Sequence, residues 1–222
     1  MKTPVRQKQL KDHFTYAWWK YGLLVLLAVF GWSIIYTMTT APVAEEKKVV
    51  VGVYSPGSEK NLAQYMQDVN LIHMPDMEQM TPMYILPDAA HGSMILLTRM
   101  AARDCDIYVL PGEEFQSWAA QGAFAELDLE LPGLIADLEA AEISLSRGRR
   151  QNEATGEKHI YGIPCRDLPG AMDVLYTDTS NMYICVFKQN ENPDNVLKFM
   201  DIFVRDLLNP PPATPTDLAP AQ

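Results

Sequence analysis

The residues with the clearest potential for chemistry lie between positions 73 and 83. This segment, HMPDMEQMTPM, places Met74, Met77, Met80 and Met83 three residues apart, beside His73. Thioether sulfur and imidazole are suitable ligands for Cu(I), and this spacing can gather sulfurs on one side of a short helix or loop. The favoured interpretation is that these methionines fill a hydrophobic core, because methionine adapts to irregular gaps. Extracytoplasmic Cu(I) binding is the alternative.

Few residues are arranged for catalysis. The chain lacks the HExxH, GxSxG and GxxxxGK motifs, whose spacings build a zinc site, a nucleophile turn and a phosphate loop. Glu113 and Glu114 are adjacent carboxylates, but acids at the start of a predicted helix are explained by the helix dipole. No histidine or cysteine at a supporting spacing accompanies them. We therefore expect a protein that is not an enzyme and has no cofactor.

The three cysteines, Cys105, Cys165 and Cys185, are an odd number without CxxC spacing. This pattern does not indicate a zinc site or a thioredoxin-like pair. Cys165 and Cys185 both fall in strand-like segments and could form a disulfide, whereas buried free thiols are the favoured alternative.

A regular alternation of strands and helices is predicted between residues 48 and 121. The apolar runs and the helical spacings indicate strands at 48–54, 83–86 and 106–110, and helices at 59–69, 91–103 and 113–121. Ser58 is placed as the N-cap of the first of these helices. This order predicts an α/β fold with a single, doubly wound, mainly parallel sheet. The first strand should be central, because its apolar run lacks polar alternation.

The pattern becomes less regular after residue 131. We expect a short helix at 134–141, an exposed loop at 146–158, and strands at 159–165 and 171–176 that pair around 167–170. A further strand at 182–187 precedes a last helix at 194–208, with Pro193 in its first turn. The tail, residues 210–222, is rich in proline and poor in apolar residues, and we expect it to be disordered.

Residues 21–40 form a run of twenty residues without a charge. This length is sufficient for a helix to cross a bilayer. Residues 1–20 carry five Lys or Arg against a single Asp, so they should remain in the cytoplasm, with the domain at 48–209 outside after a linker at 41–47. A cleaved signal peptide is the alternative, although its apolar region is usually shorter.

The chain beyond the apolar run is strongly acidic. From residue 45 onwards it contains 13 of the 18 Lys and Arg and 27 of the 28 Asp and Glu, a net charge of −14. This charge argues against nucleic acid and against anionic lipid as partners of the domain.

Four segments resemble one known family. They are GVYSPGSEK at 52–60, DIYVLPGEEFQSWAAQGAFAELD at 106–128, YGIPC at 161–165 and NMYICVFKQNENPDNVLKFMDIF at 181–203. Together they are similar to stretches of bacterial extracellular solute-binding proteins of ABC importers. The resemblance implies a periplasmic-binding-protein-like lobe and a role in transport.

The resemblance also implies that part of the usual protein is missing. Members of this family close two α/β lobes over a ligand and are about twice as long as this domain. A single lobe encloses a small molecule poorly, so binding should be weak unless a partner supplies the other wall.

Open α/β sheets bind ligands at the carboxyl ends of their strands. This rule gives the candidate ligand-binding residues, which are Tyr54, Ser55, Gly57, Ser58, Pro111, Gly112, Glu113, Tyr161 and Pro164. For Gly57 and Pro111, turn geometry is the more economical explanation.

The sequence therefore predicts a membrane-anchored, extracytoplasmic, non-catalytic binding or interaction module, which could be an accessory of a transport complex. The partner should be a membrane or envelope protein. The alternative from another class is a structural or assembly protein of the cell envelope that docks a second protein. A contiguous apolar patch would favour docking, and a concave pocket with convergent polar groups would favour a ligand.

Overall fold

The computed structural model describes residues 7–39, 43–87 and 91–210. The chain divides into two compact units, Met1–Pro42 and Val43–Gln222. The predicted tail lies almost entirely outside the described residues.

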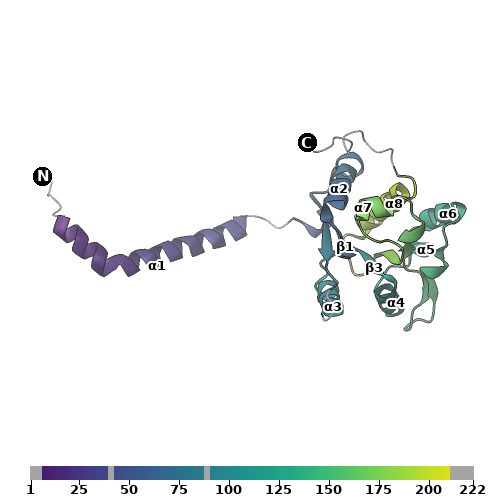
Figure 1. Cartoon of the computed structure of the whole chain (residues 1–222), viewed down its shortest axis with the longest axis horizontal. Coiled ribbons are helices and arrows are strands. Elements are labelled where there is room, and N and C mark those ends of the chain that lie inside the picture. Colours follow the sequence, from purple (N-terminus) through teal and green to yellow (C-terminus); the bar gives the residue numbers. More distant parts are fainter. Residues whose placement is uncertain (1–6, 40–42, 88–90, 211–222) are drawn as a thin grey trace. The chain divides into compact units, whose positions relative to one another are not determined.

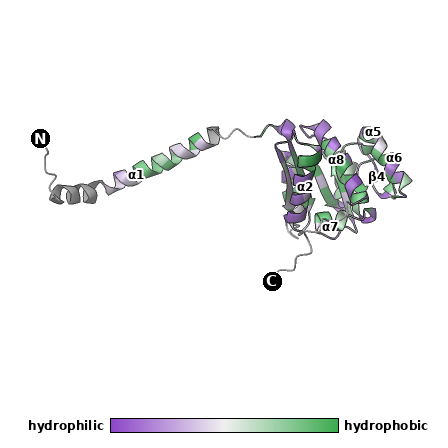
Figure 2. Cartoon of the chain, turned by 90° about the horizontal axis from the view of Figure 1, so that it is seen from above, coloured by the Kyte–Doolittle hydropathy of each residue, from purple (hydrophilic) through white to green (hydrophobic). Residues whose placement is uncertain are grey.

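The first unit contains a single long helix, α1, Gln7–Thr39 (Figure 1). Within it, Trp18–Tyr36 is long and apolar enough to cross a membrane. Its large apolar side chains are exposed, including Leu24 at 64% and Phe30 at 62%, and Figure 2 shows hydrophobic residues along the helix. The predicted apolar helix is therefore present, and it begins earlier than expected, within the basic segment.

The second unit is built on a five-stranded sheet with the strand order β2-β1-β3-β7-β6. The strands are β1 (Lys48–Tyr54), β2 (Gln79–Ile85), β3 (Ile107–Pro111), β6 (Ile163–Pro164) and β7 (Met182–Val186). β1 pairs in parallel with β2 and β3, whereas β7 is antiparallel to β3 and β6. The sheet is thus mostly parallel, and β1 lies in its interior, as predicted.

Helices cover both faces of this sheet (Figure 1). One face packs against α2 (Glu59–His73), α7 (Ala171–Leu175) and α8 (Pro193–Leu208), and the other against α3 (Gly92–Ala102) and α4 (Gly112–Ala120). The alternation of β1 explains both layers: Val49, Val51 and Val53 face the first set of helices, and Val50 faces the second. This arrangement confirms the doubly wound α/β fold.

Local signals explain where the regular helices begin. The Ser58 hydroxyl accepts a hydrogen bond from the Lys60 amide at 3.5 Å, so Ser58 is the N-cap of α2, as predicted. Pro193 is the first residue of α8, where its missing N–H costs nothing. The apolar face of α8, which includes Phe199 and Phe203, is fully buried.

Two predictions for the second half of the domain are wrong. Residues 171–176 are not a strand that pairs with 159–165, because Ala171–Leu175 forms α7. Ala171 and Leu175 are both buried, and their spacing of four residues suits one face of a helix. The predicted loop at 146–158 instead contains most of a hairpin, in which β4 (Arg149–Gln151) pairs antiparallel with β5 (Lys158–Ile160).

The hairpin turn is stabilised by a side chain. Asn152 is buried, and its Oδ1 accepts hydrogen bonds from the amides of Ala154 at 2.8 Å and Thr155 at 3.3 Å. Gly156 follows with a φ of 76°. The remaining helices are α5 (Leu127–Glu130), α6 (Pro132–Ala140) and the short 3₁₀ helices Glu45–Lys47, Leu145–Arg147 and Cys165–Asp167.

Candidate functional site

The carboxyl edge of the sheet is where β1 and β3 end. Tyr54 and Pro111 are the last residues of these two strands. After β1, the buried Ser55 hydroxyl hydrogen bonds to the hydroxyl of Thr177. Gly57 lies so close to α7 that an added Cβ would be 2.8 Å from the Tyr176 carbonyl oxygen. The segment after α7 is therefore held against the end of β1.

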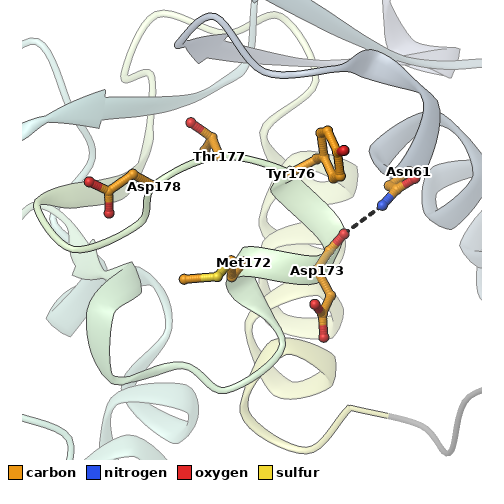
Figure 3. Close-up of a pocket in the computed structure, with 6 residues that line it drawn as sticks. All are labelled: Asn61, Met172, Asp173, Tyr176, Thr177 and Asp178. Atoms are coloured by element: carbon orange, nitrogen blue, oxygen red, sulfur yellow. Dashed lines mark hydrogen bonds between the residues drawn. The ribbon is translucent and has the colours of Figure 1, made fainter.

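An open hollow of about 580 Å³ lies at this edge, and we call it the α7 hollow (Figure 3). Its lining residues are Asn61, Met172, Asp173, Tyr176, Thr177 and Asp178. Asn61 reaches from α2, and its Nδ2 donates a 2.8 Å hydrogen bond to the Asp173 carbonyl oxygen, as Figure 3 shows. The other lining residues come from α7 and the loop that follows it.

Hydrogen bonds fix the backbone of the α7 hollow. The Tyr84 hydroxyl donates to the Leu175 carbonyl oxygen at 2.6 Å, and burial raises the pKa of Tyr84 to about 12, so this donor stays protonated. Tyr176 ends α7 in a left-handed conformation, with a φ of 47°. Its side chain is 62% exposed and that of Met172 is 59% exposed. A rigid backbone therefore presents two large apolar groups to the solvent.

One of the two acidic groups that line the hollow, Asp178, is held in its charged form. Asp178 accepts a 3.0 Å hydrogen bond from the Ser180 amide, and bonds to Ser180 hold the pKa of Asp178 below its ordinary value. The α7 hollow thus combines apolar contact area with two carboxyl groups, Asp173 and Asp178, a hydroxyl and a neutral amide.

The structure distributes the predicted ligand-binding residues over three places. Ser55 and Gly57 adjoin the α7 hollow, and Ser58 is occupied as a helix cap. Tyr54 lies on the opposite face of the sheet, beneath Gly92 at the start of α3. The predicted residues after β1 thus adjoin the α7 hollow without lining it, and ligand binding by them stays a prediction.

The remaining predicted residues lie further along the same edge. Pro111 ends β3, and the amide of the next residue, Gly112, donates to the Asn181 carbonyl oxygen at 2.9 Å. Glu113, which follows, is exposed. Tyr161 is fully buried, whereas Pro164 lines a second hollow.

The methionine segment is divided between the two layers. Met74, Met77 and Met80 are buried together in the layer of α2 and α8, while Met83 packs on the opposite face. His73 is exposed at the end of α2, and its carbonyl oxygen accepts a 3.1 Å hydrogen bond from Lys198 Nζ. Cu(I) binding stays a prediction. Of the five residues, only Met74, Met77 and Met80 lie in one layer, so only these three could share an ion.

All three cysteines are buried free thiols. Burial raises the pKa of Cys105 to about 12 and raises those of Cys165 and Cys185. A thiol with a raised pKa is a poor nucleophile at neutral pH. Within the described residues, no group of three or more His, Cys, Asp or Glu side chains could hold a metal ion.

Comparisons with known proteins give partial similarities in structure. No family model and no curated protein matches the chain. Among solved structures it is similar to an extracellular solute-binding protein of family 1 from Alicyclobacillus acidocaldarius, at 17% identity and a TM-score of 0.36, over 56% of this chain and 28% of that one. An ABC substrate-binding protein from Listeria monocytogenes, in complex with cycloalternan, matches at 18% identity and a TM-score of 0.37, over 52% of this chain and 28% of that one.

A protein of another kind also matches. Corynebacterium glutamicum OxyR is 11% identical, with a TM-score of 0.32, over 92% of this chain and 76% of that one. The chain thus spans less than a third of the length of the first solute-binding structures that it matches. At these TM-scores the similarities decide neither ligand nor partner.

Proposed function

We propose that this chain is a membrane-anchored, extracytoplasmic, non-catalytic binding module that docks a membrane protein of a transport complex through the carboxyl edge of its sheet. The sequence resemblance to solute-binding proteins supports the transport role. The net charge of the domain makes nucleic acid an unsuitable partner.

The anchor in this proposal is α1. Trp18–Tyr36 has the length and composition of a membrane span, and the basic residues before it favour a cytoplasmic N-terminus. From Tyr36 to Lys48 the chain can extend at most about 40 Å. An anchored domain would therefore remain close to the bilayer, where the local concentration of membrane partners is high.

The observation that carries the docking proposal is the openness of the α7 hollow together with the exposure of Met172 and Tyr176. A small molecule in an open hollow keeps much of its surface in water, which limits its affinity. A protein surface can cover both the hollow and its rim, and aromatic residues and methionine are enriched in such interfaces. The geometry thus favours a protein over a small solute.

Photo-crosslinking in intact cells tests this proposal. A benzoylphenylalanine residue is introduced at position 176 or 172 of the full chain, and Leu129, which is 64% exposed on α5, provides a matched control position. We expect position 176 to form a discrete crosslinked product with a membrane protein and position 129 not to do so. A protease added outside the cells should then degrade the crosslinked domain and leave an N-terminal stub.

Three results would contradict the proposal. Equal crosslinking at 176 and 129 would mean that the edge is not a docking surface, and protection from the external protease would overturn the orientation. A saturable thermal shift of the full chain with a sugar, amino acid, peptide or polyamine, abolished by Tyr176→Ala, would show instead that the single lobe is a receptor for a small solute.

A further inference from the structure

A second hollow, of about 290 Å³, lies on the same carboxyl edge of the sheet. We call it the arginine hollow. Its lining includes Arg147, Arg166, Asp167, Ser180 and Asn181. Segment 176–183 connects the two hollows, because its first residues line the α7 hollow and its last residues line this one.

Each arginine is carried by a short turn with a buried anchor. Arg147 ends the 3₁₀ helix Leu145–Arg147, in which Leu145 is buried, and Arg166 follows the fully buried Cys165. The Gly148 carbonyl oxygen accepts a 3.0 Å hydrogen bond from the Tyr161 amide. The backbones that carry the two guanidinium groups are therefore held in a fixed relation by the core.

Neither arginine pairs with a carboxylate of the described residues, although the domain is strongly acidic. Elsewhere in the domain, carboxylates pair with Lys47, Lys48, Arg99, Arg103, Lys188 and Arg205. Other cations among the described residues of the domain make no ion pair, namely Lys60, Arg149, Arg150, Lys158 and Lys198. What distinguishes Arg147 and Arg166 is that they line one hollow together. Within the described parts of the chain, neither Arg147 nor Arg166 makes an ion pair or a side-chain hydrogen bond. Asp167 also lines the hollow and pairs with neither of them.

Arg147 and Arg166 are both exposed, and with Asp167 they give the lining of the hollow a net positive charge, which attracts an anion. The planar fork of arginine matches the oxygens of a carboxylate or a phosphate and can bind them through two parallel hydrogen bonds. Ser180 and Asn181 add neutral polar side chains to the same lining. The lining therefore suits an oxyanion better than an apolar or cationic group.

We propose that the arginine hollow is an oxyanion-binding site that receives an acidic group of the protein docked at the carboxyl edge. This proposal rests on the proposed function, because the docked protein is the source of the anion. The same chemistry would also bind a free carboxylate or phosphate. Occupation of both hollows would give a docked partner one apolar contact and one charged contact, which together fix its orientation.

Residue-resolved modification of arginine by phenylglyoxal tests the site in the full chain, purified in a nonionic detergent. Mass spectrometry follows each arginine while succinate or inorganic phosphate replaces sodium chloride at constant ionic strength. We expect modification of Arg147 and Arg166 to slow several-fold and saturably. Arg149, exposed on β4 and not a lining residue, should react at a constant rate. Stronger protection by succinate would indicate a carboxylate source, and stronger protection by phosphate a phosphorylated one.

Modification rates of Arg147 and Arg166 that stay constant as the anion concentration rises, like that of Arg149, would overturn the proposal. So would protection of Arg166 that persists unchanged in Arg147→Gln, because the two side chains would then not share one anion.

A crosslinking arm connects the site to docking. The combined Arg147→Gln and Arg166→Gln changes should reduce the product formed from position 176 in cells at least several-fold, whereas Arg149→Gln should not. Crosslinking that persists without anion protection would reject this site and retain the proposed function. Anion protection without any crosslinked partner would reject the proposed function and retain the site as one for a free anion.

Discussion

The two edges of the sheet use their charges in different ways. At the amino edge, a hollow of about 210 Å³ is lined by Lys48, Arg103, Asp104, Glu191 and other residues, and its cations pair with carboxylates of the same domain. At the carboxyl edge, the arginine hollow is of comparable size, but its two cations have no such partners in the described chain. The cations of the amino edge are thus neutralised within the domain, whereas those of the carboxyl edge are available to an external anion.

The largest effect on stability that this comparison predicts comes from removing a buried side-chain amide at the amino edge. Asn192 is 6% exposed, and its Nδ2 donates to the carbonyl oxygens of Glu46 at 2.7 Å and Lys48 at 3.3 Å. Asn192→Ala removes both of these hydrogen bonds and the acceptor of the Asn195 side chain, and leaves Glu46 only the longer bond from Asn195 Nδ2, so we expect the free energy of unfolding to fall by about 1–3 kcal/mol. Urea unfolding of the full chain in detergent measures this change.

The matched control is Asn181→Ala at the carboxyl edge, where Asn181 is exposed. Its effect on the free energy of unfolding should remain within about 0.5 kcal/mol. Equal losses for the two variants would break the comparison, because both edges would then be structural.

Much of the amino-terminal half of the domain could be predicted from sequence, because its signals are local. The apolar run of β1 and the Ser58 cap each identify an element without reference to distant residues. The strand that leads to Ile85 was predicted too short, since Gln79, Thr81 and Pro82 lack a strand pattern and are ordered by pairing with β1. Distant pairing of this kind has no local signature.

The candidate site was less predictable because half of it comes from a misassigned segment. The carboxyl-end rule predicts Ser55 and Gly57, which adjoin the α7 hollow but do not line it. Met172 and Tyr176 were missed, since residues 171–176 were assigned to a strand, and a run this short does not distinguish helix from strand. Arg147 lies close in sequence to Arg149 and Arg150, but its presence in one hollow with Arg166 depends on the packing of two separate turns.

A smaller, pH-dependent effect should distinguish two aspartates at opposite edges. Asp106, at the amino edge, accepts a 2.8 Å hydrogen bond from the Val50 amide, and burial raises its pKa above the ordinary 3.8. The folded state then binds the proton more tightly than the unfolded state does, so this group's contribution to stability falls as the pH rises from about 3.8 through the raised pKa. Asp106→Asn keeps an acceptor and should abolish this fall.

Asp178, at the carboxyl edge, should behave in the opposite sense. Its pKa is lowered by hydrogen bonds from Ser180, so its stabilisation is present above the ordinary value and is lost as the pH falls through the lowered one. Asp178→Asn should therefore reduce the loss of stability in acid. Unfolding by urea at a series of pH values measures both variants, and parallel profiles for the two would show that the edges do not differ in this way.

The smallest expected effect compares one arginine from each hollow. Arg103 pairs with Glu191 at 3.7 Å, with side chains that are 50% and 57% exposed, so Arg103→Gln should lower the free energy of unfolding by at most about 1 kcal/mol. This loss should shrink at high salt, because exposed pairs are screened. Arg166→Gln removes no ion pair and should remain within about 0.5 kcal/mol at either salt concentration. If Arg166→Gln instead caused the larger, salt-sensitive loss in the free energy of unfolding, the Arg166 guanidinium would have a carboxylate partner within the domain in solution. The two edges would then not differ in how their cations are paired.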